Sequence, residues 1–387
     1  MRLTTTGSRV KGRLGDIMFT SRFSLFVSCG VIVTCVLAAC LLDSMPAAQA
    51  ATPIVMGYYP SYRTTPAPDR MRFDRFTHVI QCFVRANDEG KATLDEGLNP
   101  KPLIAAAHAH NSKVLLALGG GAGGEKFGLM VRDKVKRAQF VADVVRIMKA
   151  NGYDGLALDW EQPTAEDKAI TVEFVSQLRE QMKAANRASL LVLVVNAFAG
   201  NSQGYDGPRL RDNVDFLQVM SYDFHGSWSH AGHHSSLYGT SADRIDGKAM
   251  TFQAGLSYWR DVQGFPTQKI LMGVAGYGYG FKVKNWGEKA TSPSQYPDIS
   301  FRDARALVGK GWTRYWDAEA HAPFLVSDDK SDRISYEDEM SVADKASWMK
   351  KNGLPGFFIW ELSQDYVDGD NLLIRAAQNA WSSPTPK

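Results

Sequence analysis

Two acidic residues end a short apolar run in the stretch YDGLALDWEQP, residues 153–163. Side chains alternate between the two faces of a β-strand, so Ala157, Asp159 and Glu161 would share one face. Two carboxyl groups on a buried face cost free energy unless they have a task, and such a pair suits general acid–base chemistry. A buried ion-pair site or a helix cap would explain the two acids as well.

Polar residues follow two later apolar runs in the same way. Tyr222 and Asp223 end one run, and Trp360 and Glu361 stand at the end of another. In enzymes built from parallel strands joined by helices, the residues that do chemistry gather at the carboxyl ends of the strands. The positions of these residues therefore predict one common site.

The elements that must position these residues are short apolar runs that alternate with helical patterns. The clearest helical pattern spans 137–152, where apolar residues recur at three and four positions until Gly152. Eight near-continuous apolar runs joined by helices predict an α/β fold of the (β/α)8 TIM barrel type. The runs are 53–59, 76–84, 113–120, 155–161, 190–198, 214–223, 269–278 and 354–362.

The stretch YDGLALDWE resembles the signature Asp-Gly-x-Asp-x-Asp-x-Glu of glycoside hydrolase family 18, the family of chitinases and endo-β-N-acetylglucosaminidases. The resemblance covers about residues 53–380. It also rests on GYYPSY, FTHVIQCF, KVLLALGGG, QVMSYDFHGSW, GVAGYGYGF and GFFIWELSQD, which follow one another in the order of the family's strands. The fold that this resemblance implies is the same barrel.

The resemblance also implies a chemistry. Family members cleave β-1,4 bonds beside N-acetylglucosamine with retention, and the substrate's own acetamido oxygen is the nucleophile. Glu161 matches the proton donor, Asp159 the residue that orients the acetamido N–H, and Tyr222 the donor to the acetamido carbonyl. The expected substrate-binding residues are Asp223, Trp360, Tyr58, Met220 and Gly120.

One position departs from the family pattern, because the middle acid of the signature corresponds to Ala157. In the family this acid can share a proton with the next one, since two close carboxylates resist ionising together. Without that partner, we expect Asp159 to stay ionised. The identity of the acid is not affected, because Glu161 is present.

Two other motifs carry less weight. The stretch GGGAGGEK, residues 119–126, lacks the Gly-Lys-Ser/Thr ending of a phosphate loop and is interpreted as a tight turn near the substrate. The stretch HGSWSHAGHH could suggest zinc, but it resembles a metal-free loop of the family, so we expect no metal and no cofactor. Its histidines are His225, His230, His233 and His234.

The sequence also predicts the organisation of the chain. Residues 51–381 would form the catalytic barrel, and 382–387 a disordered tail. The segment at about 282–334 breaks the rhythm of helices and strands. It resembles a shortened version of the family's insertion that walls one side of the groove, placed before the last strand.

Residues 1–50 have the pattern of a secretory signal: basic residues, then twenty uncharged residues from Phe23 to Leu42, then AQA at 48–50. The predicted location is therefore secreted or periplasmic. Two alternatives remain open. The stretch LAAC at 37–40 resembles a lipoprotein box that would place a lipid on Cys40, and the apolar stretch is long enough for an uncleaved membrane anchor.

Charge and cysteine content exclude some functions. Residues 1–50 hold five basic and two acidic residues, so the rest of the chain has 39 of each and no net charge. Such a balance gives no reason to expect a nucleic-acid partner. Outside the predicted signal, Cys82 is the single cysteine, so that part of the chain can form no internal disulfide. We expect a monomer.

The sequence thus predicts an exported retaining glycoside hydrolase acting on N-acetylglucosamine polymers, with chitin as the first choice. Cleavage of peptidoglycan or N-glycans is the enzymatic alternative. A lectin on the same barrel is the alternative from another class, although lectins of this kind typically lose the catalytic Glu, which is present here as Glu161.

Overall fold

The computed structural model describes residues 52–384 except 64, 122–123, 241–243, 246–247 and 291. The predictions for the signal at 1–50, for Cys40 and for the tail beyond residue 384 concern residues outside this described part. Of the helices in the described part of the chain, none has the length and apolar character needed to cross a bilayer.

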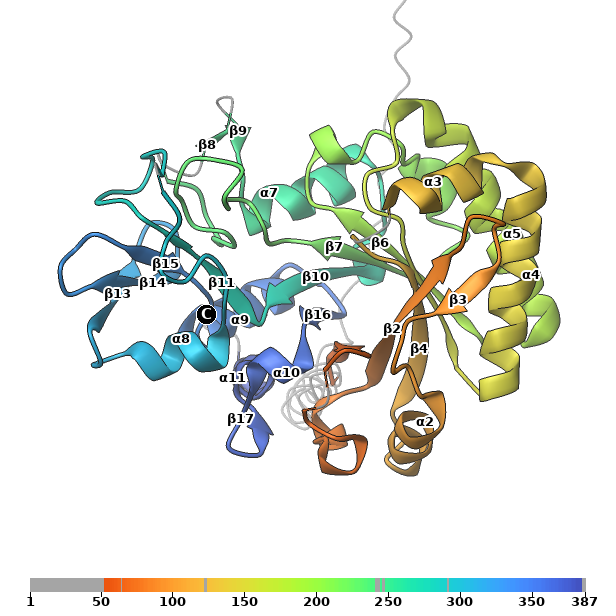
Figure 1. The fold of residues 1–387 in the computed structure, drawn as a ribbon, viewed down its shortest axis with the longest axis horizontal. Helices are drawn as coiled ribbons and strands as arrows, with labels where there is room; N and C mark the ends of the chain where they lie inside the picture. Colours follow the sequence, from red (N-terminus) through yellow and green to blue (C-terminus); the bar gives the residue numbers. More distant parts are fainter. Residues whose placement is uncertain are drawn as a thin grey trace, which may run out of the picture. The chain divides into compact units, whose positions relative to one another are not determined.

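Eight parallel strands form a closed ring, which confirms the predicted barrel (Figure 1). Each of the eight apolar runs overlaps one of these strands. The ring closes because β1 pairs with β2 on one edge and with β16 on the other. The strands are β1 (Ile54–Pro60), β2 (His78–Ala86), β4 (Lys113–Gly119), β5 (Gly155–Asp159), β6 (Leu190–Asn196), β7 (Phe216–Met220), β10 (Ile270–Ala275) and β16 (Gly356–Trp360). A short strand, β3 (Ala92–Leu94), adds to β2 in the antiparallel sense.

Helices connect the strands, and α4 and α5 cover the outer side of the ring (Figure 1). The predicted helix at 137–152 is α4, which begins at Lys134 because the Asp133 side chain accepts bonds from the next backbone N–H groups. It ends at Gly152, whose φ of 83° is the left-handed cap that glycine favours. The α-helices are α2 (Pro100–Ala109), α3 (Gly124–Arg132), α4 (Lys134–Asn151), α5 (Lys168–Ala185), α6 (Gly207–Leu210), α7 (Phe252–Ser257), α8 (Phe301–Leu307), α9 (Glu339–Lys351), α10 (Leu362–Asp365) and α11 (Leu372–Ser382).

The strands of the ring separate two apolar layers. Leu156, Leu158 and Trp160 face outward and pack against the helices. Ala157 faces inward and packs in the barrel interior, where its register partners are Ala117 and Val192. The predicted alternation of side chains along β5 is therefore present.

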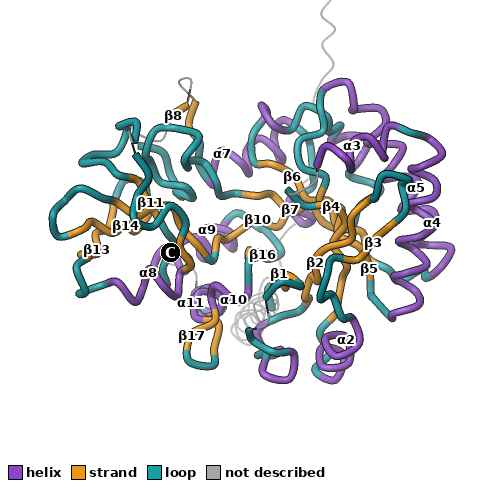
Figure 2. The backbone as a smooth tube through the Cα atoms, in the orientation of Figure 1, coloured by secondary structure: helices purple, strands orange, loops and turns teal. Residues whose placement is uncertain are grey.

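A second, antiparallel sheet lies on the side of the barrel away from α4 and α5 (Figure 2). Its later strands, β12 to β15, come from the segment predicted at about 282–334, but the sheet begins earlier, at Tyr277. The sequence run at 269–278 is divided between β10 and the first strand of this sheet, because the chain turns at Gly276, whose N–H donates to the carbonyl of Trp360. The strands are β11 (Tyr277–Phe281), β12 (Ile299–Ser300), β13 (Trp312–Asp317), β14 (Ala322–Ser327) and β15 (Arg333–Ser335).

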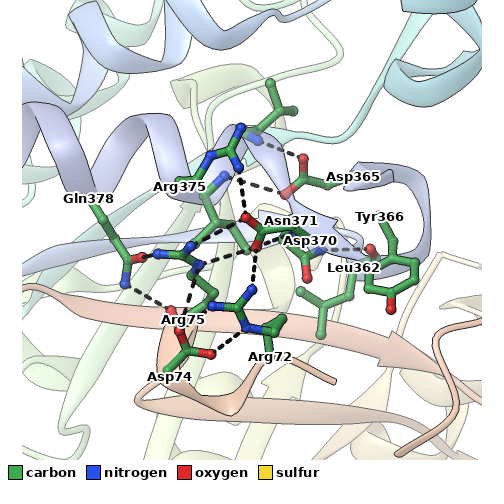
Figure 3. Close-up of polar contacts among 12 residues, drawn as sticks. Arg72, Asp74, Arg75, Leu362, Asp365, Tyr366, Asp370, Asn371, Arg375 and Gln378 are labelled. Atoms are coloured by element: carbon green, nitrogen blue, oxygen red, sulfur yellow. Dashed lines mark hydrogen bonds and ion pairs between the residues drawn. The ribbon is translucent and has the colours of Figure 1, made fainter. Parts of the chain in front are cut away.

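A charged cluster ties the segment after β1 to the end of the barrel (Figure 3). The carboxylate of Asp370 accepts two hydrogen bonds of 3.2 Å from Arg75 and one of 3.0 Å from Arg375, and Arg72 lies 3.8 Å away. Asp370 belongs to the short hairpin of β17 (Tyr366–Val367) and β18 (Asp370–Asn371) that leads into α11. The cluster therefore joins the first and last units of the ring.

The end of the described chain differs from the prediction of a disordered tail from 382. Ser382 is the last residue of α11, and the N–H of Ser383 bonds back into the helix. Lys350 donates to the carbonyls of Trp381 and Ser383 at 2.6 and 2.8 Å. A lysine from α9 thus satisfies carbonyls that the end of α11 leaves free.

Candidate active site

The carboxyl ends of the ring strands surround a cavity of about 330 Å³. Of the eight residues predicted for the site, all except Gly120 line this cavity. Gly120 lies behind the wall at a φ of 82°, where a Cβ would come within 2.8 Å of the Phe83 ring. The structure therefore brings the predicted residues together, and their roles stay predictions.

Asp159 ends β5 in apolar surroundings. Its side chain is 5% exposed, and its Oδ1 has no hydrogen-bond partner among the described residues. Ala157 and Cys82, both fully buried, share the barrel interior below it. Burial, and then the charge of Glu161, raise the pKa of Asp159 well above its usual value. Burial therefore acts against our expectation that Asp159 stays ionised: the loss of an acid at 157 removes a like charge, but the apolar surroundings of the carboxyl favour its neutral form.

Glu161 follows β5 and is only partly exposed. Burial and the nearby Asp223 raise the pKa of its carboxyl, whereas Arg85 and the N–H of Gly121 oppose this rise. A carboxyl group with a raised pKa can hold a proton close to neutral pH, which a general acid requires. The arrangement therefore suits Glu161 for proton donation.

Tyr222 and Asp223 lie just beyond β7. Asp223 adopts a φ of 61°, and its Oδ1 accepts hydrogen bonds from Tyr277 at 2.6 Å and Tyr279 at 3.0 Å. Burial raises the pKa of Asp223, and the two tyrosines lower it. Both tyrosines lie on β11 and were not predicted as site residues. The spacing of aromatic residues in GYGYG, at the end of a predicted strand, was the available signal.

Aromatic rings form the floor of the cavity. Trp360 lies 5.3 Å from the ring of Tyr58 and is stacked on Phe83 at 5.9 Å and 28°. The hydroxyl of Tyr58 donates to Gln218 at 2.6 Å, which fixes the tyrosine in the barrel interior. A flat ring at a strand end can support the apolar face of a sugar.

The space continues beyond Glu161 on two sides. A cavity of about 680 Å³ shares Glu161, Tyr222 and Asp223 with the first and reaches Trp228, which is 61% exposed. A third cavity of about 350 Å³ lies between Glu161 and Arg132. Glu161 therefore lies where the three cavities meet, and an open cleft of this kind suits a chain-like ligand better than a small closed one.

The four histidines of the loop after β7 do not form a metal-binding group. His233 is paired with Asp317 at 3.1 Å, and His225 packs against His230 at 4.8 Å. Burial lowers the pKa of His234 to about 3, so its ring is neutral. In the described part of the chain, no three His, Cys, Asp or Glu side chains are arranged to hold a metal.

Sequence reasoning also missed Arg85. The register of β2 against β4 shifts between Gln81 and Val84. Ile80 faces inward before this irregularity, and the consecutive residues Cys82 and Phe83 both face inward within it. Simple alternation would have placed Arg85 on the outer side, and a bulge of this kind leaves no clear sign in the sequence.

Comparison with known proteins identifies the family. The model of "Glycosyl hydrolases family 18" matches residues 54–365. A probable endochitinase of Caenorhabditis elegans is 32% identical over 75% of this chain and 51% of its own length, and an endochitinase of Manduca sexta is 28% identical over 81% and 63%. The chain therefore spans less than two thirds of either relative.

The solved structure of an immunomodulatory active chitinase from Trichuris suis has a TM-score of 0.78 and 25% identity, with 84% of this chain and 99% of that one covered. Human YKL-39 has the same TM-score at 22% identity over 86% of this chain and 100% of that one, and so shows the fold alone. Because the family model spans most of the chain, this protein belongs to glycosyl hydrolase family 18.

Proposed function

We propose that the protein hydrolyses β-1,4 bonds of N-acetylglucosamine polymers and that chitin is its substrate. The observation that carries the proposal is that Glu161, which lines all three cavities of the cleft, shares one of them with Asp159 and Trp360. Relatives named endochitinase support the choice of chitin.

In the proposed reaction, Glu161 donates its proton to the leaving oxygen while the substrate's acetamido oxygen attacks the sugar carbon. Tyr222 donates to the acetamido carbonyl and aligns it, and Trp360 supports the ring of the same sugar. Glu161, now a carboxylate, removes a proton from the water that opens the oxazolinium intermediate. The product therefore retains its anomeric configuration.

Asp159 has a role that follows from its surroundings. Its raised pKa favours the neutral carboxyl in the free protein. The positive charge that develops on the oxazolinium favours the carboxylate, so Asp159 releases its proton to solvent in the cavity that it lines. Asp159 would then accept from the acetamido N–H and act as the counter-charge.

The test compares the products formed from chitin oligomers, peptidoglycan and a high-mannose glycopeptide by mass spectrometry. Cleavage of the chitin oligomers supports the proposal, and cleavage of either other glycan alone contradicts the choice of chitin. Binding without cleavage of any glycan would favour a lectin. This outcome has a precedent on the fold, because YKL-39 is described as a pseudo-chitinase with retained chitooligosaccharide binding properties.

Ala157→Asp is expected to move the acidic limb of the kcat profile to higher pH without changing the retained configuration of the product. The new carboxyl group would lie on the same strand face as Asp159, and its like charge would raise the pKa at which the pair becomes fully ionised. The measurement is kcat from acid to neutral pH on a soluble chitin oligomer. Ala157→Asn is the matched control, because it adds the same bulk without a charge.

If the profiles of wild type and Ala157→Asp superimpose, position 157 only fills the barrel interior. An equal shift in Ala157→Asn would attribute the change to bulk in the interior rather than to charge.

The proposal also covers the cellular location and the oligomeric state. The signal at 1–50 would direct export, the mature protein would begin at Ala51, and it would be a monomer. N-terminal sequencing of the exported protein tests the cleavage site. A lipid on Cys40 with extraction only by detergent would replace this proposal with the lipoprotein alternative.

A further inference from the structure

Arg85 is a basic residue inside the catalytic cavity. Of the described residues that line this cavity, Arg85 alone carries a positive charge, and it shares the wall with Asp159 and Glu161. Its guanidinium is fixed at three points: Nε and Nη2 donate to the two oxygens of Asp95 at 2.9 and 3.1 Å, and Nη1 donates to the carbonyl of Gly119 at 2.9 Å. A guanidinium group held by these hydrogen bonds stays in place without substrate.

The carbonyl that Arg85 holds belongs to a turn that contacts both acids. Gly119 pairs with Asp159 in the barrel, and the N–H of Gly120 donates to the carbonyl of Asp159 at 2.8 Å. Gly121 lies close to the carboxyl of Glu161, since a Cβ on it would come within 3.2 Å of both carboxyl oxygens, and its N–H helps to lower the pKa of that group. Gly119 has a φ of 101°, and a Cβ on it would come within 2.3 Å of the Asp159 carbonyl, so the turn fits tightly against β5.

Arg85 also supports the floor of the cavity. Its guanidinium lies over the ring of Phe83 at 4.9 Å, and Phe83 is stacked on Trp360. Arg85 therefore contacts Phe83, and Phe83 in turn contacts Trp360, the ring that would support the sugar.

The charged and titratable groups around the acid pair come from several elements. They are Tyr58 from β1, Cys82 and Arg85 from β2, Tyr205, and Tyr222 and Asp223 after β7. In this set, the charge of Arg85 stabilises the ionised forms of Asp159 and Glu161, whereas Asp223 opposes ionisation of Glu161.

We propose that Arg85 is a positioning residue of the acid pair: it holds the turn at Gly119–Gly121 against both acids, and its positive charge, which also pairs with Asp95, favours their ionised forms. This inference rests on the proposed function for its effect on turnover.

The test uses the purified mature protein and three variants. Arg85→Met removes the charge and the fork, and Arg85→Lys keeps the charge but cannot bond Asp95 and the Gly119 carbonyl together. Arg314→Met is the control, because Arg314 also pairs with a carboxylate, Asp338 at 2.7 Å, and lies over a ring, Trp316 at 5.6 Å, but in the second sheet. Thermal unfolding of each variant establishes that it is folded.

The first readout is a ¹³C NMR titration of the side-chain carboxyl groups, with Asp159 and Glu161 assigned through Asp159→Asn and Glu161→Gln. Arg85→Met should raise the titration midpoints of both carboxyls, Arg85→Lys should leave them close to wild type, and Arg314→Met should not move them. This readout needs no turnover, so it decides on Arg85 even if the wild-type protein cuts none of the glycans.

The second readout is kcat on a soluble chitin oligomer. Arg85→Met and Arg85→Lys should both lower kcat by about tenfold to 100-fold, because the turn no longer holds the acids in register, and only Arg85→Met should move both limbs of the pH profile to higher pH. Carboxyl titrations of Arg85→Met that superimpose on wild type overturn the proposal, as does an equal shift in Arg314→Met.

Discussion

Glu161→Gln is expected to lower the turnover of a soluble chitin oligomer at least about 100-fold and to leave oligosaccharide binding nearly intact. The amide has the shape of the acid but no acidic proton to transfer, and Glu161 is the residue assigned to both proton transfers. The aromatic floor and Tyr222, which would bind the sugar, are unchanged. The measurements are kcat by product analysis and the dissociation constant by calorimetry.

Glu166→Gln is the matched control, because Glu166 is an exposed carboxylate on the loop that follows the same strand. Its turnover should equal that of wild type. Near-normal turnover of Glu161→Gln would remove Glu161 from the mechanism. Loss of binding together with turnover would show that the residue holds the sugar instead.

Lys345→Met is expected to lower the free energy of unfolding by about 3–5 kcal/mol. Lys345 is fully buried on α9, where its ammonium pairs with Glu337 and donates to Ser235 Oγ at 2.9 Å. Methionine fills a similar volume, but it leaves Glu337 as a buried charge without its cation. Ser341, which donates to Glu337 at 2.6 Å, compensates only in part.

The measurement is urea unfolding, with two comparison variants. Arg305→Met breaks an exposed pair, Arg305 with Glu339 at 3.4 Å, and should cost about 1 kcal/mol or less because solvent screens that pair. The double variant Lys345→Met with Glu337→Met removes both charges and should recover most of the loss. If Lys345→Met is as mild as Arg305→Met, the buried pair does not stabilise the fold as described.

The sequence predicted those features that depend on local pattern. Continuous apolar runs identified the eight ring strands, and alternation along β5 placed Ala157 and Asp159 on the inner face. The pattern did not predict Arg85, because a register shift in β2 changes which residues face inward. Side-chain direction after such a shift is set by the neighbouring strands, which a single sequence does not display.

The direction of the pKa shift of Asp159 was not predicted, for a related reason. The sequence shows that an acid is missing at 157, and the removal of one like charge favours ionisation. The structure adds the apolar surroundings of the carboxyl group, which act in the opposite direction and raise its pKa. Burial is a property of the assembled barrel, so the balance between the two effects was not available from residue types alone.

The closure of the ring through β16 determines when the site can exist during synthesis. β1 and β2 can pair early, but β1 and β10 each keep an unpaired edge until β16 lies between them. The same strand carries Trp360. A ribosome must therefore translate the chain through residue 360 before either the ring or the cleft is complete, and every shorter nascent chain presents open strand edges that can pair with the wrong partner. Completion of this cleft is accordingly one of the last events in the formation of the protein.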